Sequence, residues 1–218
     1  MANTFPRWAN WLPLKIVICL AVLGAGVTAG VTYYFTPKYT RVGYMPEQPV
    51  PFSHRIHVDQ LGLDCRYCHS YVEKSKHSNV PATQTCMGCH QHVKRDSSKL
   101  ELVRKNWEEG KPIPWVKVHV APDYVYFDHS VHVSRGVGCV ECHGQVNRME
   151  KVYHAKPHSM AWCLGCHRKP EKYLRPLEHI FDLDWTAGSG KDQLAMGREL
   201  KEKWRIDPPV ADCAGCHR

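Results

Sequence analysis

The sequence predicts one transmembrane helix followed by a domain of short helices and irregular chain that folds around bound cofactors. Residues 16–35 form an uncharged run that is long enough to cross a bilayer as a helix. Ten of the eleven cysteines stand in five Cys-x-x-Cys pairs, and each pair is followed directly by histidine. Fifteen prolines and fifteen glycines in 218 residues argue against long regular elements elsewhere.

The uncharged run at residues 16–35 is interpreted as a retained membrane anchor. A cleaved signal peptide is the alternative, but its apolar region is usually shorter. Two tryptophans precede the run and a cluster of tyrosines ends it, as in the aromatic belts at the two faces of a bilayer. Gly26 and Gly30 have a spacing that lets helices approach closely, although ordinary anchors also contain it. Cys19, the cysteine outside the pairs, is interpreted as an apolar filler.

Paired cysteines can form disulfides, bind zinc or attach haem. Disulfides and zinc sites do not require a histidine directly after each pair. Haem c requires all three residues, because the two thiols form thioethers with the porphyrin and the histidine binds the iron. Five complete motifs therefore predict five covalently bound haem c groups. The expected thioether residues are Cys65, Cys68, Cys86, Cys89, Cys139, Cys142, Cys163, Cys166, Cys213 and Cys216, and the expected proximal iron ligands are His69, His90, His143, His167 and His217.

The formal net charge of +8 is attributed to lysines and arginines that balance the negative charge of the cofactors. A basic balance often indicates binding to nucleic acid or to an anionic membrane surface. The acidic propionates of five haems would offset most of this charge, and the lysines and arginines are spread along the chain instead of forming one patch. We therefore expect no nucleic-acid partner.

Cytochromes of the c type mature outside the cytoplasm, so the residues after the helix are expected on the extracytoplasmic, periplasmic side. The chain would then be a single-pass protein of the cytoplasmic membrane, in contact with lipid. The proline-rich segment after the helix is interpreted as an extended linker. The predicted organisation is a cytoplasmic N-terminus at 1–15, a transmembrane helix at 16–35, a linker at 36–51 and an extracytoplasmic pentahaem domain at 52–218.

An internal repeat divides much of the pentahaem domain into two tandem dihaem units, at about 52–92 and 127–167. Each unit begins with a Phe-x-His-x-x-His element, at 52–57 and 127–132, and continues with two haem motifs. The second motif of each unit reads Cys-x-Gly-Cys-His. The fifth motif, at 213–217, has no such element before it and must take its second iron ligand from elsewhere in the chain.

Two longer helices are expected outside the haem motifs. One is predicted at Lys99–Glu109, capped by Ser97 or Ser98 and ended by Gly110. The other is predicted at about Asp192–Trp204. Elsewhere we expect short helices and irregular chain, because five macrocycles must form much of the core.

Five irons require five sixth ligands, and ten histidines remain outside the motifs. The two histidines of each Phe-x-His-x-x-His element occupy equivalent positions in the two units, and each pair can reach two different haems. His119 lies in an apolar run that would bury it, which favours a ligand role. The predicted distal ligands are His54, His57, His119, His129 and His132.

Four further residues could also bind iron. His77 and His154 each stand nine residues before a cysteine of a haem motif. Met149 and Met160 could replace an imidazole and would raise the potential of that haem. For the fifth haem we expect an imidazole from an earlier His-x-x-His pair, with Met149 next. Irons with two strong ligands have no open position for a substrate, so the chain is expected to transfer electrons and to contain no catalytic residue.

The chain resembles the pentahaem cytochrome c subunit of alternative complex III, a quinol-oxidising respiratory or photosynthetic complex. The resemblance includes segments around and between the motifs, at 52–57, 65–69, 85–90, 118–129, 139–144 and 160–168. It implies a multihaem cytochrome c domain of class III, or c7-like, type and covers nearly the whole chain. The five predicted distal histidines fall on the recurring histidine positions of that family, whereas His77, His154 and His158 depart from it.

The resemblance also implies partners, namely an iron–sulfur protein, polytopic quinol-binding membrane subunits, a monohaem cytochrome c and a soluble electron acceptor. The chain would be an electron-transfer subunit of a quinol:acceptor oxidoreductase. A self-sufficient multihaem quinol dehydrogenase is the main alternative. It would need an open or weakly ligated haem beside the anchor, and the paired His54 and His57 argue against one. A multihaem reductase would need a vacant iron, and the supply of histidines argues against that.

Overall fold

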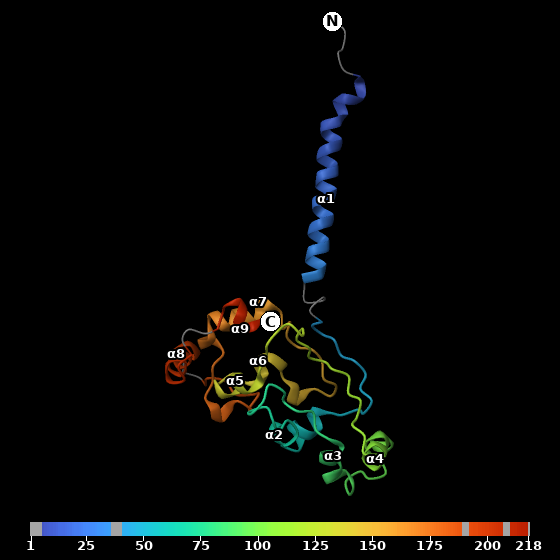
Figure 1. Cartoon of the computed structure of the whole chain (residues 1–218), viewed down its shortest axis with the longest axis vertical. Helices are drawn as coiled ribbons and strands as arrows, with labels where there is room; N and C mark the ends of the chain where they lie inside the picture. The colour runs from blue at the N-terminus through green and yellow to red at the C-terminus, as the bar shows by residue number, and fades with distance from the viewer. Residues whose placement is uncertain (1–5, 36–40, 189–191, 207–209, 218) are drawn as a thin grey trace. The chain divides into compact units, whose positions relative to one another are not determined.

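The computed structural model describes residues 6–35, 41–188, 192–206 and 210–217 (Figure 1). The chain divides into two compact units, the first ending at Val42 and the second beginning at Gly43. Residues 1–5 of the predicted N-terminal segment and residues 36–40 of the predicted linker lie outside the described residues.

The described residues of the first unit consist mainly of one long helix. A 3-10 turn, η1 (Arg7–Trp11), leads into α1 (Leu12–Phe35). The helix begins before the uncharged run because proline is tolerated in a first turn, where Pro13 stands, and lysine, as at Lys15, is a good helix former. Trp8–Tyr34 is long and apolar enough to cross a membrane, and the same length and composition would also suit a signal sequence.

The second unit consists of short helices joined by irregular chain. Five α-helices carry the haem motifs, namely α2 (Cys65–Cys68), α3 (Thr83–His90), α6 (Cys139–His143), α7 (Met160–Arg168) and α9 (Cys213–Cys216). The other helical elements are the π-helical turn η2 (Arg55–Gln60), η3 (Ser98–Leu100), α4 (Glu101–Glu108), α5 (His129–Ser134), η4 (Val146–Arg148), η5 (Pro170–Lys172), η6 (Leu177–His179) and α8 (Gln193–Lys203). Within the described ranges β-structure is limited to two isolated bridges, Val125 with His217 and Val137 with Leu174.

Both longer helices predicted from the sequence are confirmed. The first appears as η3 continued by α4, preceded by Ser97, whose side chain makes no capping hydrogen bond. The second is α8, and the Asp192 carboxylate caps it by accepting a hydrogen bond from the Leu194 N–H. A Cβ at Gly197 in α8 would collide with the Glu171 carbonyl in η5, so glycine is required where these two elements meet.

Apolar side chains form only small clusters in the second unit. One cluster contains Val50, Val103 and Ile113, and the other contains Val72, Val133 and Ile180. Several motif residues pack on them, among them Cys86 and Met87 on the first cluster and Cys139 on the second. The clusters therefore lie beside the haem motifs, and side chains alone do not form one continuous core.

A buried arginine joins the middle of the domain to the third haem motif. Arg175 is 5% exposed, and its guanidinium donates hydrogen bonds to the Glu141 carboxylate (2.9 Å) and to the Asp182 carbonyl (3.0 Å). Glu141 lies inside the third motif, so this ion pair fixes α6 to the loop after η5. Gly138 lets the guanidinium pass, because a Cβ there would collide with Arg175.

Candidate haem-binding site

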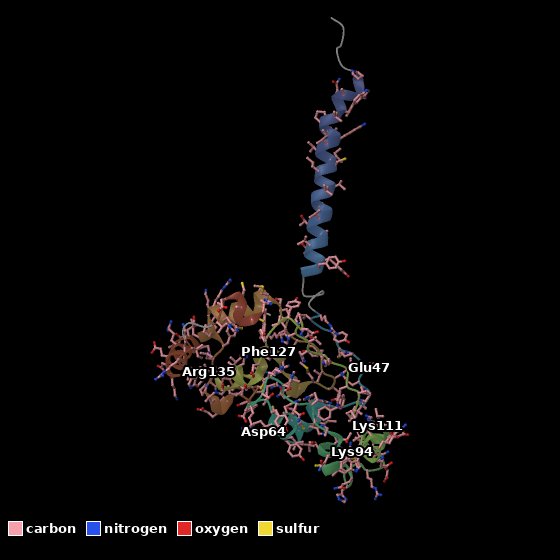
Figure 2. The ribbon with its side chains drawn as sticks, in the orientation of Figure 1. Glu47, Asp64, Lys94, Lys111, Phe127 and Arg135 are labelled. Carbon is pink, nitrogen blue, oxygen red and sulfur yellow. The ribbon has the colours of Figure 1, made fainter. Side chains whose placement is uncertain are left out.

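We name the five motifs sites 1 to 5 in chain order. In every site the two cysteines are three residues apart on a helical turn, so both sulfurs lie on the same side of that turn. Asp64, Ser159 and Asp212 cap α2, α7 and α9 by accepting a backbone hydrogen bond in the first turn (Asp64 is labelled in Figure 2). The local sequence therefore forms the turn that thioether attachment at both sulfurs requires.

Six of the predicted iron ligands are oriented by the main chain. Their Nδ1 atoms lie within hydrogen-bond distance of backbone carbonyl oxygens, which can only accept, so Nδ1 carries the proton and the Nε2 lone pair is available. Metal-bound histidines usually have this arrangement. The bonds join His57 to Ser53 (2.8 Å), His69 to Asn79 (2.7 Å), His90 to Val93 (3.0 Å), His129 to Lys76 (2.7 Å), His132 to Asp128 (2.7 Å) and His167 to Val210 (2.6 Å).

The two Phe-x-His-x-x-His elements have the same geometry. In each, the phenylalanine ring meets the first histidine edge-on and stacks on the second; Phe127 is labelled in Figure 2. This agreement supports equivalent roles for the two pairs. The centroid distances are 4.9 Å for Phe52–His54, 4.4 Å for Phe52–His57, 4.8 Å for Phe127–His129 and 4.7 Å for Phe127–His132.

Three pairs of imidazoles have the separation expected of two ligands on one iron. An imidazole nitrogen lies about 2 Å from a bound metal ion, so two imidazoles on opposite sides of one iron have ring centroids about 6 Å apart. The donor set and its spacing therefore suit iron held between two histidines. The measured centroid distances are 6.1 Å for His57–His90, 6.0 Å for His132–His167 and 6.4 Å for His129–His143.

The remaining predicted distal ligands, His54 and His119, are half-buried, and their imidazoles are electrically neutral. Burial, with a smaller contribution from the nearby His69, lowers the pKa of His54 to about 4. Burial likewise lowers the pKa of His119 to about 4, with a smaller contribution from His158. Among the described residues the Nδ1 of His54 and the Nε2 of His119 are buried without a hydrogen-bond partner. A buried neutral imidazole with an unpartnered nitrogen suits metal ligation.

His143 of site 3 is surrounded by other imidazoles, and burial lowers its pKa well below the usual value. The His129 ring lies 6.4 Å away and is nearly parallel, at 5°. The His119 ring lies only 4.5 Å away and is perpendicular, at 86°. At that distance His119 packs against His143 and does not stand opposite it across an iron. His129 therefore has the spacing of its partner.

His154 and His158 form a hydrogen-bonded pair beside site 3. The His158 Nε2–H donates to the Cys142 carbonyl (2.9 Å), so its Nδ1 is an acceptor and the His154 Nε2–H donates to it (3.1 Å). Both nitrogens of His158 and one of His154 are thus engaged, which disfavours these residues as ligands. Met149 is buried and could reach an iron inside the domain, whereas Met160 and His77 are exposed.

His217 of site 5 lies beside a segment from the middle of the chain. Its backbone forms a bridge with Val125, and its ring centroid is 5.8 Å from that of Tyr124. The Tyr126 N–H donates to the Cys216 carbonyl (2.7 Å). The segment that follows His119 therefore runs directly along the last haem motif.

Helical Cys-x-x-Cys-His turns with oriented imidazoles define a multihaem cytochrome c. Residues 50–105 and 125–218 match the family described as cytochrome c7 and related cytochrome c, and the chain belongs to that family. Membership implies covalently bound haem c, so this class of cofactor is confirmed and the c7-like fold prediction is borne out.

Two curated relatives support a link between the chain and redox complexes. The multihaem cytochrome c subunit of a menaquinone reductase from Nitratidesulfovibrio vulgaris is 36% identical over 98 residues, which are 44% of this chain and 46% of the relative. The cytochrome subunit of an acrylate reductase from Shewanella woodyi is 26% identical over 111 residues, which are 51% of this chain and 68% of the relative. The chain thus spans about half the length of the first relative, and both are similar to it only in part.

Sequence reasoning missed the groups that orient the ligands. Six acceptors are main-chain carbonyls, and a carbonyl leaves no mark in the sequence. The pairing of His154 with His158 and of Arg175 with Glu141 also went unpredicted. Of these groups only Glu141 could have been noticed in the sequence. A carboxylate inside a haem motif is partly buried when the motif packs, and it then needs a cation nearby.

Proposed function

We propose that the chain is a membrane-anchored, pentahaem electron-transfer subunit of a quinol-oxidising complex such as alternative complex III. The observation that carries the proposal is the set of five attachment turns, of which those of sites 2, 3 and 4 have histidines that stand about 6 Å from a further imidazole. When bound, haem c supplies one-electron chemistry, and two strong axial ligands favour electron exchange over substrate binding. The two relatives, subunits of a menaquinone reductase and an acrylate reductase, support a redox complex of this kind.

Axial ligands are proposed as follows. His54 and His129 serve sites 1 and 3, and His57 and His132 serve sites 2 and 4, so the two units are equivalent. The four histidines of the two Phe-x-His-x-x-His elements are then all assigned to sites 1 to 4. His119 therefore remains for site 5, in place of the second imidazole from an earlier pair that the sequence suggested. Its unpartnered Nε2 and the path of the following segment along His217 support this assignment. Met149 is the second candidate for site 5.

Five covalent haems are expected per chain, because five motifs are complete. Acid–acetone extraction removes non-covalent haem, and intact mass spectrometry then counts what remains. The mass should exceed that of the polypeptide by five haems. A mass increase of four haems or fewer would contradict the count.

The proposed complex can be tested by purification from the native membrane. The tagged chain, solubilised in mild detergent, should co-purify with an iron–sulfur protein, polytopic membrane subunits and a monohaem cytochrome c. Quinol should reduce its haems in this complex. If the purified chain alone is reduced by quinol at the rate of the complex, the self-sufficient quinol dehydrogenase is favoured instead.

The proposed orientation has α1 in the membrane and the haem domain on the periplasmic side. We also predict that the stripe of small residues on α1 packs against a partner helix. A Cβ at Gly26 or Gly30 would have no contact within 4 Å outside the helix's own backbone, so a side chain there has room to be accommodated. The double variant Gly26→Leu/Gly30→Leu should remain in the membrane and lose its partners on purification.

Gly24→Leu is the matched control, because Gly24 is equally open and lies on a different side of the helix. It should retain the partners. Equal recovery of partners with the control and the double variant would show that the stripe is only anchor composition.

A further inference from the structure

Contacts between segments connect the five attachment sites in an order that differs from the order in the sequence. Sites 1 and 2 meet directly, since a Cβ at Gly88 of site 2 would lie 3.7 Å from the Tyr67 hydroxyl of site 1. Site 1 also meets the segment of site 3. The loop after His69 provides the Lys76 carbonyl that accepts from His129 (2.7 Å), and Val72 of this loop packs with the cluster that contacts Cys139.

The chain of contacts continues from site 3 to sites 4 and 5. His158 donates to the Cys142 carbonyl of site 3, and its ring centroid lies 5.2 Å from that of Trp162, the residue before site 4. His167 of site 4 donates to the Val210 carbonyl, which lies just before site 5 (2.6 Å). Site 4 therefore adjoins both site 3 and site 5.

Exposure distinguishes the two ends of this row. Of the ten motif cysteines only Cys89 and Cys213 are exposed, and they belong to sites 2 and 5. In Figure 1, α3 and α2 lie at the lower end of the second unit, α6 lies in the middle, and α7 and α9 lie together at the upper end. Sites 1, 3 and 4 lie between the two exposed ends.

We propose that the attachment sites follow one another in the order 2, 1, 3, with sites 4 and 5 beyond site 3, and that an acidic one-electron carrier protein docks at the site 2 end. The proposal deepens the proposed electron-transfer function and rests on it. Each exchange moves one electron, so the donor is oxidised by one electron, the acceptor is reduced by one electron, and no atom is transferred.

The charge at site 2 indicates an acidic partner. Lys94, Arg95 and Lys99 follow the site directly, are exposed, and form no ion pair with any described residue, while Asp96 is the one acid among them. Figure 2 shows Lys94 at the end of the domain that contains α3 and α4. At site 5, the described residues 210–217 contain no lysine or arginine and carry the exposed Asp212. The two ends therefore suit different partners.

The order is tested by electron paramagnetic resonance of the full-length oxidised chain. Variants that lose both cysteines of one site lack one haem, and the low-spin signals of its neighbours should change. Loss of site 2 should change only the signal of site 1, and loss of site 1 should change the signals of sites 2 and 3. If loss of site 2 changes the signals of both site 1 and site 3, the sites follow the sequence order and the proposal fails.

If a variant that lacks one haem does not fold, a variant that changes one iron ligand is used in its place. His90→Met retains both cysteines and hence the haem of site 2, and alters one axial ligand only. Its redox titration should show shifted potentials at sites 2 and 1 and unchanged potentials at sites 3, 4 and 5. A shift at site 3, with or without one at site 1, would overturn the order.

Docking is tested by stopped-flow reduction of the purified chain with flavodoxin, an acidic one-electron donor. The double variant Lys94→Glu/Arg95→Glu should be reduced about tenfold more slowly at low ionic strength, with the difference disappearing at high salt. The control Lys169→Glu/Lys172→Glu changes two exposed lysines after site 4 and should match the wild type. Equal rates for the two variants would overturn the docking site. Neither readout requires quinol or a partner subunit, so failure here is distinguishable from failure of the proposed complex.

Discussion

Alanine in place of His132 is expected to convert one low-spin iron to a high-spin state or to ligation by water. The His132 ring stands 6.0 Å from that of His167, so its loss leaves one axial position without an imidazole. A weaker ligand should also raise the potential of that haem. Electron paramagnetic resonance of the oxidised protein measures the loss of one low-spin signal, and His57→Ala should do the same at site 2.

His77→Ala is the control for both variants. His77 is exposed and lies in the loop that provides two orienting carbonyls, while its own side chain is not proposed as a ligand. All low-spin signals should persist in it. If His132→Ala or His57→Ala also retains every low-spin signal, the ligand scheme is wrong, and Met149, His77 or His154 must bind iron.

Arg175→Ala is expected to lower the free energy of unfolding by about 3 kcal/mol. The substitution leaves the Glu141 carboxylate, whose side chain is 25% exposed, without its cation, and it removes the hydrogen bond to the Asp182 carbonyl. The guanidinium also lies over the Trp185 ring, 5.2 Å from its centroid. Denaturant unfolding followed by circular dichroism and by the haem absorption band measures the change.

Arg148→Ala provides the comparison, because Arg148 pairs with Asp184 at 2.7 Å but both side chains are about half exposed. Exposed pairs contribute about 0–1 kcal/mol, so this variant should be close to the wild type. Arg175→Lys should fall between the two, since it retains the charge and loses the planar fork of donors. Equal unfolding midpoints in denaturant for Arg175→Ala and Arg148→Ala would show that burial of the Arg175–Glu141 pair does not contribute to stability.

Local features of this protein are predictable from the sequence. The helical turn at each motif follows from the spacing of two attached cysteines, and the caps at Asp64 and Asp212 use residues that favour helix N-termini. The equivalence of the two Phe-x-His-x-x-His elements follows from their residues and reappears in matching ring geometry. The ends of the longer helices differ from those expected by one or two residues, which is ordinary fraying.

Long-range features were not predictable. The Lys76 carbonyl reaches His129 across 53 residues, and the Val210 carbonyl reaches His167 across 43. Every residue has a backbone carbonyl, so no pattern of residue types indicates which carbonyl is used. The path of the loops decides it, and that path depends on the packing of small clusters such as Val72 with Val133. The spatial order of the sites has the same origin.

Orientation of the imidazoles by carbonyl groups has a consequence for how such a sequence diverges over time. A side-chain acceptor can be lost by a single substitution, whereas the carbonyls of Lys76 and Val93 persist whatever residue replaces them. These loops are therefore free to change their surface chemistry without disturbing the metal centres. The exception is Asn79, whose backbone has φ of 72° and whose carbonyl holds His69. There only glycine, asparagine or aspartate preserves the conformation easily, so this position should vary far less than its neighbours among related chains.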